Sequence, residues 1–410
     1  MTTDELRAAS AELVRLHERF AFVFGRCEAR AHSLSYVQGL LSPLRRKSVE
    51  PMALAQEQGS VPALQRFLTR APWDAARLQQ EIQAVFAQEL LPSASAWPLG
   101  TVGVVDSSDF PKQGRHSVGV ARQHSGRLGK TANCQVGVFL LGVTPAGCAL
   151  LEEQLYVPKS WSRAQGLRRQ TRIPKGTRFQ TKPALAGELL RRVRDAGHVR
   201  FDWVVADADY GKDRQWLRQL EHQHQRYLVA VPQDTLVWRV NPAQGYASDP
   251  EHRDRAGAGR RAHVVSVAEL AQQLPAAAWQ RLTVRPGAQG PLCFDFAAVR
   301  VWAVRRRRPG PELWLVLRRS LEAQPEIKYY LSNAEAQTPL ATLALAACCR
   351  WRVEEYLQDS KSYLGMAQYE ARSWTSWHHH MSLVALAHLY VTLTRLRLKK
   401  KRRNSPWTER

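Results

Sequence analysis

Apolar residues recur at helical spacing through the first hundred residues. The stretches "DELRAASAELVRLHERFAFVF" and "WDAARLQQEIQAVFAQEL" each place their apolar side chains along one face of a helix. Between them, "GLLSPLRRKSVEPMALAQ" sets a basic turn beside a further helix, and "LPSASAWPLG" has the composition of a linker. The pattern predicts a helical N-terminal region over residues 1–97.

From residue 98 the pattern changes to short apolar strands. "TVGVVD" predicts a strand over 101–106, and "CQVGVFLLGVT" and "CALLEEQLYVP" predict a hairpin over 134–144 and 148–158. Next come a helix near 184–197, a strand at 201–207, a helix near 213–224 and a strand at 226–232. A hairpin followed by β-α-β predicts an α/β fold, a mixed sheet flanked by helices, whose first part covers residues 98–232.

After residue 232 the alternation of strands and helices stops, and it starts again near residue 328. Residues 233–327 combine Gly/Pro-rich turns with strand candidates such as "CFDFAAVRVWAV" and "ELWLVLRRS", which predicts a β-rich insertion. "KYYLSNA" then leads into a helix over about 338–364 and another over 377–398, so residues 328–398 form the second part of the core. Residues 399–410 form a basic tail, which we expect to bind nucleic acid non-specifically.

Charge narrows the range of partners. Lys and Arg outnumber Asp and Glu by 59 to 36, a formal net charge of +23. Such an excess favours nucleic acid as the partner. No run of about 18 apolar residues predicts a membrane span, and the N-terminus has no signal-peptide pattern. The six cysteines lack metal-binding spacing, which indicates reduced thiols in a cytoplasmic protein.

Three carboxylates stand out against this basic background. Asp106 and Asp207 each directly follow an apolar strand, and Glu354 lies on a helix with Arg350 and Lys361 at i−4 and i+7. At about 100° per residue, the three helical side chains fall within about 40° of one another. A strand-end Asp alone is more often a cap, and a helical Glu–Lys pair is usually a solvated face. Their order along an α/β pattern favours a common site.

Converging carboxylates repel one another unless they hold a cation. Hard oxygen ligands suit Mg²⁺, with Mn²⁺ as a substitute. Two such ions about 3.5–4 Å apart can activate a water or a 3′-hydroxyl and stabilise the leaving oxygen of a phosphodiester. The acids therefore predict a two-ion site, with Asp106, Asp207 and Glu354 as both catalytic residues and ligands.

Three motifs together resemble one known group. "VVDSSDFPKQGRHSVGVARQHSGRLGKTANCQVGVFL", "VVADADYG" and "RWRVEEYLQDSKSYLG" are similar to the acid-bearing motifs of bacterial insertion-sequence DDE transposases, most closely the insertion sequence 701 family. "RFAFVFGRCEARAHSLSYVQGLLSPLRRKSVEPMA" also fits. The resemblance implies an RNase H-like fold, the triad Asp106, Asp207 and Glu354, and DNA contact by Arg350 and Lys361. It also implies that the helical region over 1–97 binds DNA.

The chain departs from the family pattern at several positions. Ala347 stands where the resemblance implies Tyr, and Asp109 and Asp209 are extra acids beside the motif positions. Glu355 is a rival to Glu354, which the i+4 spacing from Arg350 favours.

The resemblance further implies cleavage at transposon ends and strand transfer into target DNA, with both DNAs as partners. A homodimer is expected in the synaptic complex, at the nucleoid of a bacterial cytoplasm. Two alternatives stay open: an RNase H-like nuclease that cuts without joining, and a domesticated DNA-binding regulator with an unused site. The net charge argues against a glycosidase, which would also use paired carboxylates.

Basic and aromatic residues supply candidate DNA contacts. The loop over 159–182 carries eight Lys or Arg and no acid, which predicts phosphate contacts. The predicted contacts in and before this loop are Lys112, Arg168, Arg169, Arg172, Lys175, Arg178 and Lys182. Trp238 and Trp302 are either stacking platforms for a flipped base or ordinary core aromatics. The run "WHHHM" cannot place three His on one helix face, so a structural or DNA-facing role is expected.

Overall fold

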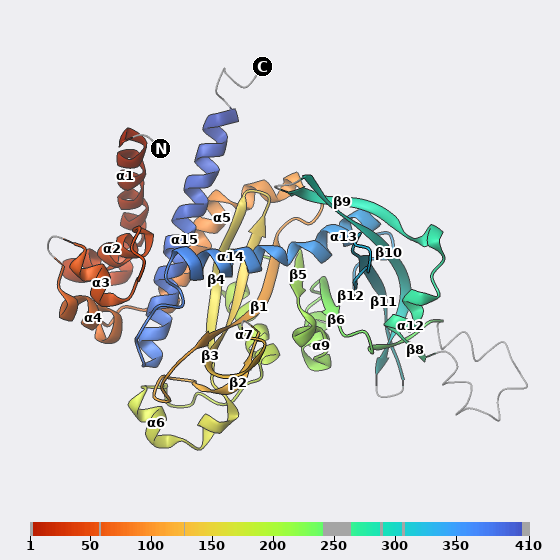
Figure 1. Cartoon of the computed structure of the whole chain (residues 1–410), viewed down its shortest axis with the longest axis horizontal. Coiled ribbons are helices and arrows are strands. Elements are labelled where there is room, and N and C mark those ends of the chain that lie inside the picture. The colour runs from red at the N-terminus through yellow and green to blue at the C-terminus, as the bar shows by residue number, and fades with distance from the viewer. Residues whose placement is uncertain are drawn as a thin grey trace, which may run out of the picture. The chain divides into compact units, whose positions relative to one another are not determined.

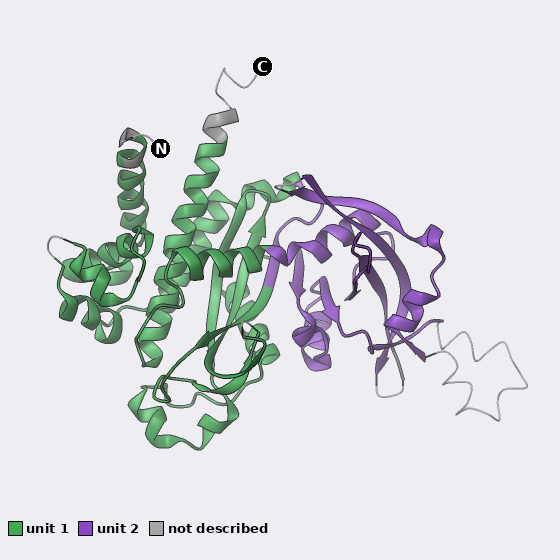
Figure 2. Ribbon diagram, in the orientation of Figure 1, with its two compact units in different colours: residues 1–96, 105–200, 352–410 green, residues 97–104, 201–351 purple. Residues whose placement is uncertain are grey.

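The chain forms two compact units, each assembled from distant segments (Figure 2). The computed structural model describes residues 3–56, 59–126, 128–240, 264–287, 290–305 and 308–403. Unit 1 contains residues 1–96, 105–200 and 352–410, and unit 2 contains residues 97–104 and 201–351. The two units do not correspond one to one to the five predicted segments. The boundaries of those segments stay a prediction.

Within the described ranges, twelve strands form a mixed sheet (Figure 1). The strand order is β2-β3-β1-β5-β6-β12-β11-β10-β7-β8, with β4 paired to β3 and β9 to β10. β5 pairs with β6 in parallel, whereas β3–β4 and β10–β11 are antiparallel. Helices flank this sheet, so the α/β prediction is confirmed, and the arrangement is consistent with an RNase H-like fold.

Unit 1 begins with the helices that the sequence predicted. They are α1 (Thr3–Phe20), α2 (Cys27–Leu41), α3 (Val49–Leu54), α4 (Val61–Arg70) and α5 (Ala75–Glu89). Ser60 and Asp74 begin α4 and α5 as N-caps, since their side chains accept hydrogen bonds from the backbone of Ala63 and Ala76. Their apolar faces are buried, which confirms the helical character of this region.

The strands and helices of the predicted core in unit 1 include one element longer than expected. They are β1 (Val102–Pro111, shared with unit 2), β2 (Ala121–Ser125), β3 (Lys130–Thr144), β4 (Gly147–Tyr156), α6 (Gln165–Gln170) and α7 (Lys182–Ala196). The predicted hairpin is confirmed as β3 and β4. β1, however, continues to Pro111, so Asp106 lies inside the strand and not at its end. Residues 106–109 are mostly polar, so they give no apolar strand pattern in the sequence. In the structure, β1 pairs with neighbouring strands of the sheet.

Unit 2 alternates strands and short helices before a β-rich segment. Its elements are β5 (Trp203–Ala206), α8 (Ala208–Gly211), α9 (Arg214–His222), β6 (Tyr227–Val231), β7 (Leu236–Trp238), β8 (Val264–Ser266), α12 (Val267–Gln272), β9 (Gln280–Gly287), β10 (Gly290–Arg305), β11 (Arg308–Arg319), β12 (Ile327–Ser332) and α13 (Leu340–Cys349). The β-α-β pattern and the strands of the insertion are present as predicted.

The helix predicted over 338–364 is wrong as a single element. The structure has α13, which ends at Cys349 with Arg350 as its C-cap, and a separate α14 (Trp351–Tyr363). Neither Gly nor Pro marks the junction, so the local sequence carries no stop signal there. Arg350 therefore does not share one continuous helix with Glu354 and Lys361.

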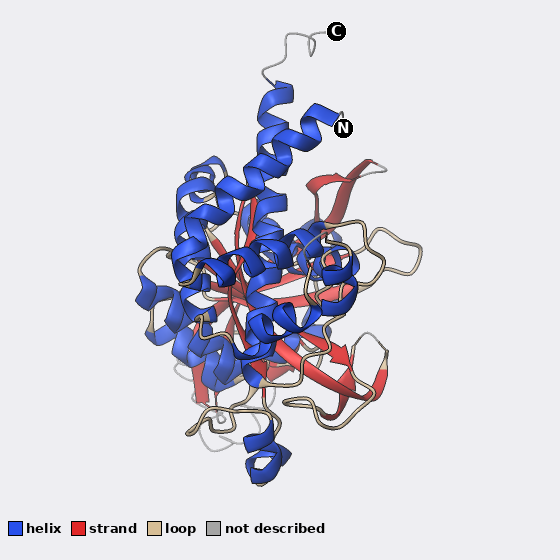
Figure 3. Cartoon of the chain, turned by 90° about the vertical axis from the view of Figure 1, so that its left-hand side faces the viewer, coloured by secondary structure: helices blue, strands red, loops and turns tan. Residues whose placement is uncertain are grey.

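The last helix, α15 (Trp374–Arg403), runs beside α1 within unit 1 (Figures 1 and 3). The hydroxyl of Tyr390 donates to the carbonyl of Ala9 at 2.7 Å, and Arg397 pairs with Glu12 at 2.9 Å. Part of the predicted basic tail is therefore helical, and residues 404–410 lie outside the described residues. Among the helices that were searched, none is long and apolar enough to cross a membrane.

The three consecutive histidines near the start of α15 have three different sets of partners. His378 contacts Glu153, and His380 bonds the hydroxyl of Tyr36 and the carbonyl of Met366. The two ring nitrogens of His379 lie 2.9 and 3.0 Å from the carbonyls of Leu68 and Trp73, and a neutral ring donates to one of them. Burial lowers the pKa of His379 to about 4 and that of His380 to about 3. Of the two roles expected for this run, structural or DNA-facing, these contacts support the structural one, because the rings fasten α15 to its surroundings.

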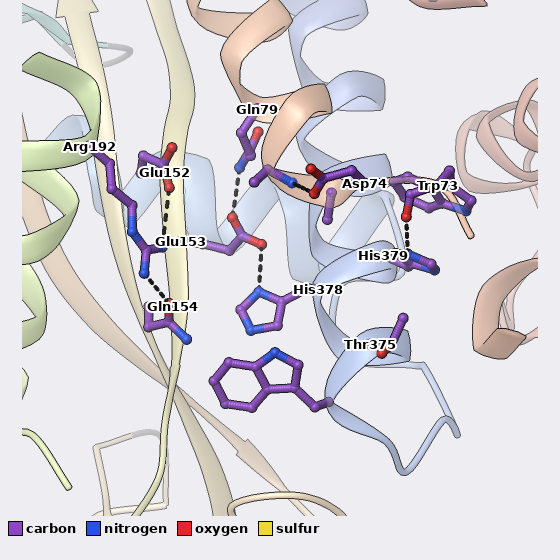
Figure 4. Close-up of a pocket in the computed structure, with 13 residues that line it drawn as sticks. Trp73, Asp74, Gln79, Glu152, Glu153, Gln154, Arg192, Thr375, His378 and His379 are labelled. Carbon is purple, nitrogen blue, oxygen red and sulfur yellow. Dashed lines mark hydrogen bonds and ion pairs between the residues drawn. The ribbon is translucent and has the colours of Figure 1, made fainter. Parts of the chain in front are cut away.

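A polar network fills the space between α5, β4, α7 and α15 (Figure 4). It surrounds a cavity of about 350 Å³ in unit 1. Glu153 accepts a hydrogen bond from Gln79 at 2.8 Å and contacts His378 at 3.2 Å, whereas Glu152 faces Arg192 at 3.7 Å. Burial, together with the charge of Glu153, raises the pKa of Glu152 to about 8.

This buried carboxyl predicts a pH-dependent stability. The folded state holds the Glu152 proton up to about pH 8, whereas the unfolded chain releases it near the ordinary value of 4.5. Because the folded state then binds more protons, the free energy of unfolding falls as the pH rises through this window, by up to about 1.4 kcal/mol per pH unit. E152Q cannot ionise, so urea unfolding should show the variant gaining stability relative to the unsubstituted chain between about pH 5 and pH 8. Parallel pH profiles would contradict the assignment.

Candidate active site

Asp106 is a buried carboxylate inside β1. Its side chain is 7% exposed, and its Oδ1 accepts a hydrogen bond from the backbone N–H of Ser107 at 2.7 Å. Side chains alternate between the faces of a strand, so Asp106, Ser108 and Phe110 share one face and Ser107 and Asp109 the other. The burial pattern follows this alternation, because the first three are buried and the last two are half-buried.

Two lysines reach β1 from other elements of unit 1. Lys361, on α14, donates to the hydroxyl of Ser108 at 2.7 Å and to the carbonyl of Asp109 at 3.1 Å. It also lies 5.1 Å from the ring centroid of Phe110, which places it on the Asp106 face. Lys182, at the start of α7, reaches the hydroxyl of Ser107 at 3.4 Å. The structure thus brings two of the predicted DNA-contacting lysines to the residues that follow Asp106.

Lys112 is engaged elsewhere. Its ammonium donates to the carbonyl of Tyr369 at 3.1 Å and lies 3.5 Å from the centre of that ring. Burial lowers the pKa of Lys112 to about 8. These contacts argue against the predicted contact with a scissile strand, because the ammonium is held against Tyr369.

The structure distinguishes Glu354 from Glu355. Glu354 is exposed on α14 and lies seven residues before Lys361, which is about 20° away around a helix. It therefore shares the stripe of α14 whose lysine contacts β1. Glu355 lies off this stripe and pairs with Arg352 at 3.2 Å. Asp109, one of the two additional acids, accepts a hydrogen bond from Ser125.

Asp207, the second acid of the predicted triad, lies in unit 2. It follows β5 directly, as predicted, and caps α8, because its Oδ1 accepts from the backbone N–H groups of Asp209 at 2.9 Å and Tyr210 at 3.4 Å. Burial raises the pKa of Asp207, and the charge of Asp209 adds to this, whereas Arg350 opposes it. Asp209 itself pairs with Lys212 at 2.6 Å. A carboxylate in these surroundings gains from a nearby cation.

The donor chemistry of these acids suits a hard divalent ion. Asp106 and Glu354 belong to unit 1 and Asp207 to unit 2, so neither unit contains the whole set. Across the described part of the chain, no three His, Cys, Asp or Glu side chains gather closely enough to hold a metal ion. The argument for a divalent ion therefore rests on the type of ligand, since all three side chains offer carboxylate oxygens. One of them, Asp207, lies where burial disfavours its negative charge.

The predicted basic loop is largely exposed. Arg169 is exposed on α6, and Arg172, Lys175 and Arg178 are exposed between α6 and α7. Arg168 is half-buried on α6 and donates to the carbonyl of Thr177 at 2.6 Å. The exposed four therefore present cationic groups to solvent, as phosphate contact would require.

The two tryptophans of the insertion differ in exposure. They face each other across β7 and β10, where Trp302 pairs with Trp238. Trp238 is only 3% exposed, and Trp302 is half-buried. The burial of the Trp238 ring favours the second alternative for this residue, an ordinary core aromatic of unit 2.

Ser107 and Ser108 were missed by the sequence reasoning. Their hydroxyls receive Lys182 and Lys361, so they connect α7 and α14 to the strand that carries Asp106. The only signal was their position in "VVDSSDF", directly after the first acid.

Comparison with known proteins identifies the group to which the chain belongs. A protein named "Probable transposase for insertion sequence element IS701", from Microchaete diplosiphon, is 27% identical over 200 residues. The match covers 48% of each chain, so this chain spans about half the length of that relative. A family described as DDE superfamily endonuclease matches residues 19–291, most of the chain, including Asp106 and Asp207 but not Glu354. The chain is thus a member of the DDE superfamily endonucleases, as its motifs had indicated.

Proposed function

We propose that the chain is a DDE transposase that cuts DNA at the ends of a mobile element and joins those ends to target DNA. The observation that carries the proposal is the surroundings of Asp106: a buried carboxylate on a strand to which Lys182 and Lys361 are tied. Carboxylates beside fixed cations are what a phosphodiester site needs, since the acids hold metal and the cations hold phosphate.

Members of the superfamily generally use divalent metal ions. In this chain, Asp106, Asp207 and Glu354 would hold two Mg²⁺ or Mn²⁺ ions. When bound, such ions increase the nucleophilicity of a water or 3′-hydroxyl and stabilise the leaving oxygen. Lys182, Lys361 and the exposed arginines of the basic loop would hold the phosphates in register.

The proposed chemistry consists of two in-line displacements at phosphorus. In the first, a water oxygen bonds to phosphorus, the bond to the 3′ oxygen breaks, and that oxygen takes up a proton. In the second, this 3′-hydroxyl attacks a target phosphodiester, loses its proton and displaces the target's own 3′ oxygen. Both steps have the same charge distribution at phosphorus, so one set of residues can serve both.

Two ends must be held together for joining, so we propose a homodimer in the synaptic complex. Its partners would be element-end DNA and target DNA, at the nucleoid of a bacterial cytoplasm. An endonuclease that cuts without joining is the second candidate, and the family description favours it equally. Pre-cleaved ends distinguish the two, because only a transposase joins them to a second DNA.

Asp207 provides the first test. D207A and D207N should each slow metal-dependent nicking of end-containing DNA by about 10²–10⁴-fold, because a charged oxygen donor is lost. D207N keeps an oxygen that can cap α8, so it should fold like the unsubstituted chain. The readout is nicking and joining of labelled DNA with Mg²⁺ and with EDTA.

A matched control lies nearby in unit 2. Asp213 caps α9 in the same way, accepting from the backbone of Gln215 at 3.0 Å and Trp216 at 2.9 Å. D213N should therefore leave nicking intact. Specific DNA binding without any cleavage under Mg²⁺ or Mn²⁺ would refute the enzyme and leave a DNA-binding regulator.

Glu354 and Glu355 provide the second test, since they are adjacent and isosteric. E354Q should reduce nicking about as severely as D207N, whereas E355Q should stay within a few-fold of the unsubstituted chain, because Glu355 is paired with Arg352. Equal losses in both variants, or a loss in E355Q alone, would show that the glutamate has been misassigned.

A further inference from the structure

The β-rich part of unit 2 turns two arginines onto one face of its sheet. β9 pairs with β10 through Arg281 opposite Asp295 and, farther along, Arg285 opposite Leu292. The register shifts between Leu292 and Cys293, which marks a bulge. Without the shift, Arg281 and Arg285 would point to the same side, since they are four residues apart. The bulge instead turns Arg285 to the opposite face, as bulges commonly do.

Arg318 occupies that same face. It lies opposite Phe296 in the pairing of β10 with β11, and Phe296 and Leu292 are an even number of residues apart on β10. Side chains an even number of residues apart share a face. Arg285 and Arg318 therefore point to one side of the sheet, and their neighbours Arg281 and Arg319 point to the other.

Aromatic rings hold both guanidinium groups in place. Arg285 lies 4.0 Å from the ring centroid of Trp351, and Arg318 lies 4.5 Å from that of Phe294. Arg318 also donates to the sulfur of Cys348 at 3.8 Å. Burial raises the pKa of the Cys348 thiol, and the charges of Arg318 and Arg285 both oppose that change. Both arginines thus lie near the end of α13.

Neither guanidinium has a carboxylate partner within the described ranges of the chain. Their neighbours do, because Arg281 and Arg319 each pair with Asp295 at 3.0 Å. The Nε of Arg285 is buried and has no hydrogen-bond partner. The single carboxylate of Asp295 therefore offsets part of the positive charge on one face of the sheet. The other face holds two stacked arginines, one of which has a donor without a partner.

A third arginine of unit 2, Arg350, lies near Asp207. Arg318 and Arg350 both act electrostatically on Tyr330, and Arg350 also acts on Asp207. These residues all belong to unit 2. Arg318 and Arg350 thus both lie near Tyr330, and Arg350 also lies near Asp207.

We propose that Arg285 and Arg318 form a binding site for the backbone phosphates of a DNA strand. The proposal rests on the proposed function, which makes DNA the partner. A guanidinium stacked on a ring keeps its N–H edge free and loses little freedom on binding, and its planar donors match a phosphate. The competing explanation is that the stacks only fasten β9 and β11 to the end of α13, which needs no DNA.

The salt dependence of DNA binding separates the two explanations. With the full chain, R285Q and R318Q should each weaken binding about tenfold and reduce the slope of log K against log salt concentration by about 1, because one phosphate contact is lost. The effect should be the same on duplexes with and without the element's end, since phosphate contacts are independent of sequence. R281Q and R319Q, on the same two strands, are the matched controls and should leave the slope unchanged.

The proposal is overturned if R285Q and R318Q keep the slope of R281Q and R319Q. Where a Gln variant melts at a lower temperature than its control, R285K or R318K takes its place. Lysine keeps the charge and should restore the slope, whereas a Lys variant that folds normally yet behaves like Gln indicates a packing role and also overturns the site.

Cleavage by the unsubstituted chain keeps the two proposals apart. Metal-dependent nicking together with unchanged slopes in R285Q and R318Q removes this site and leaves the transposase. Reduced slopes without any nicking by the unsubstituted chain support the phosphate site and remove the proposed enzyme.

Discussion

The burial of a carboxylate inside a strand is the constraint around which unit 1 is organised. Asp106 lies within β1 and is 7% exposed, where an isolated charge would be costly. The backbone N–H of Ser107 donates to its carboxylate and reduces that cost, and Lys182 and Lys361 bond the hydroxyls of the next two residues. Because Lys182 begins α7 and Lys361 ends α14, both helices are tied to the polar segment of β1. The element that carries the candidate chemistry therefore also fixes its neighbours.

Acids and bases are distributed unevenly between structural and surface roles. The acidic pair Glu152 and Glu153 lies in an internal network with Gln79, His378 and Arg192, far from any use for phosphate. The cations of the loop between α6 and α7 are instead exposed to solvent. The net charge of +23 leaves a surplus of positive groups for a partner, and part of that surplus lies on this exposed loop.

Pairing also separates arginines that look identical in the sequence. Arg318 and Arg319 are adjacent on β11, yet one stacks on Phe294 and the other is neutralised by Asp295. No composition or spacing rule distinguishes them, because the difference arises from strand alternation and from the position of a single acid on β10. The bulge that turns Arg285 to the other face is likewise not visible in the sequence, since it depends on how β9 and β10 pair.

The sequence by itself determined the α/β class, the helical N-terminal region, the hairpin over β3 and β4, and Asp207 at the end of β5. These follow from local periodicity, because a strand or helix with one buried face must repeat its apolar residues at a set spacing. Only the tertiary structure decided that β1 continues past Asp106, that α13 and α14 separate at Arg350, and that Trp238 is buried. Each of these depends on contacts between residues distant in the chain, which override local propensity and leave no local signal.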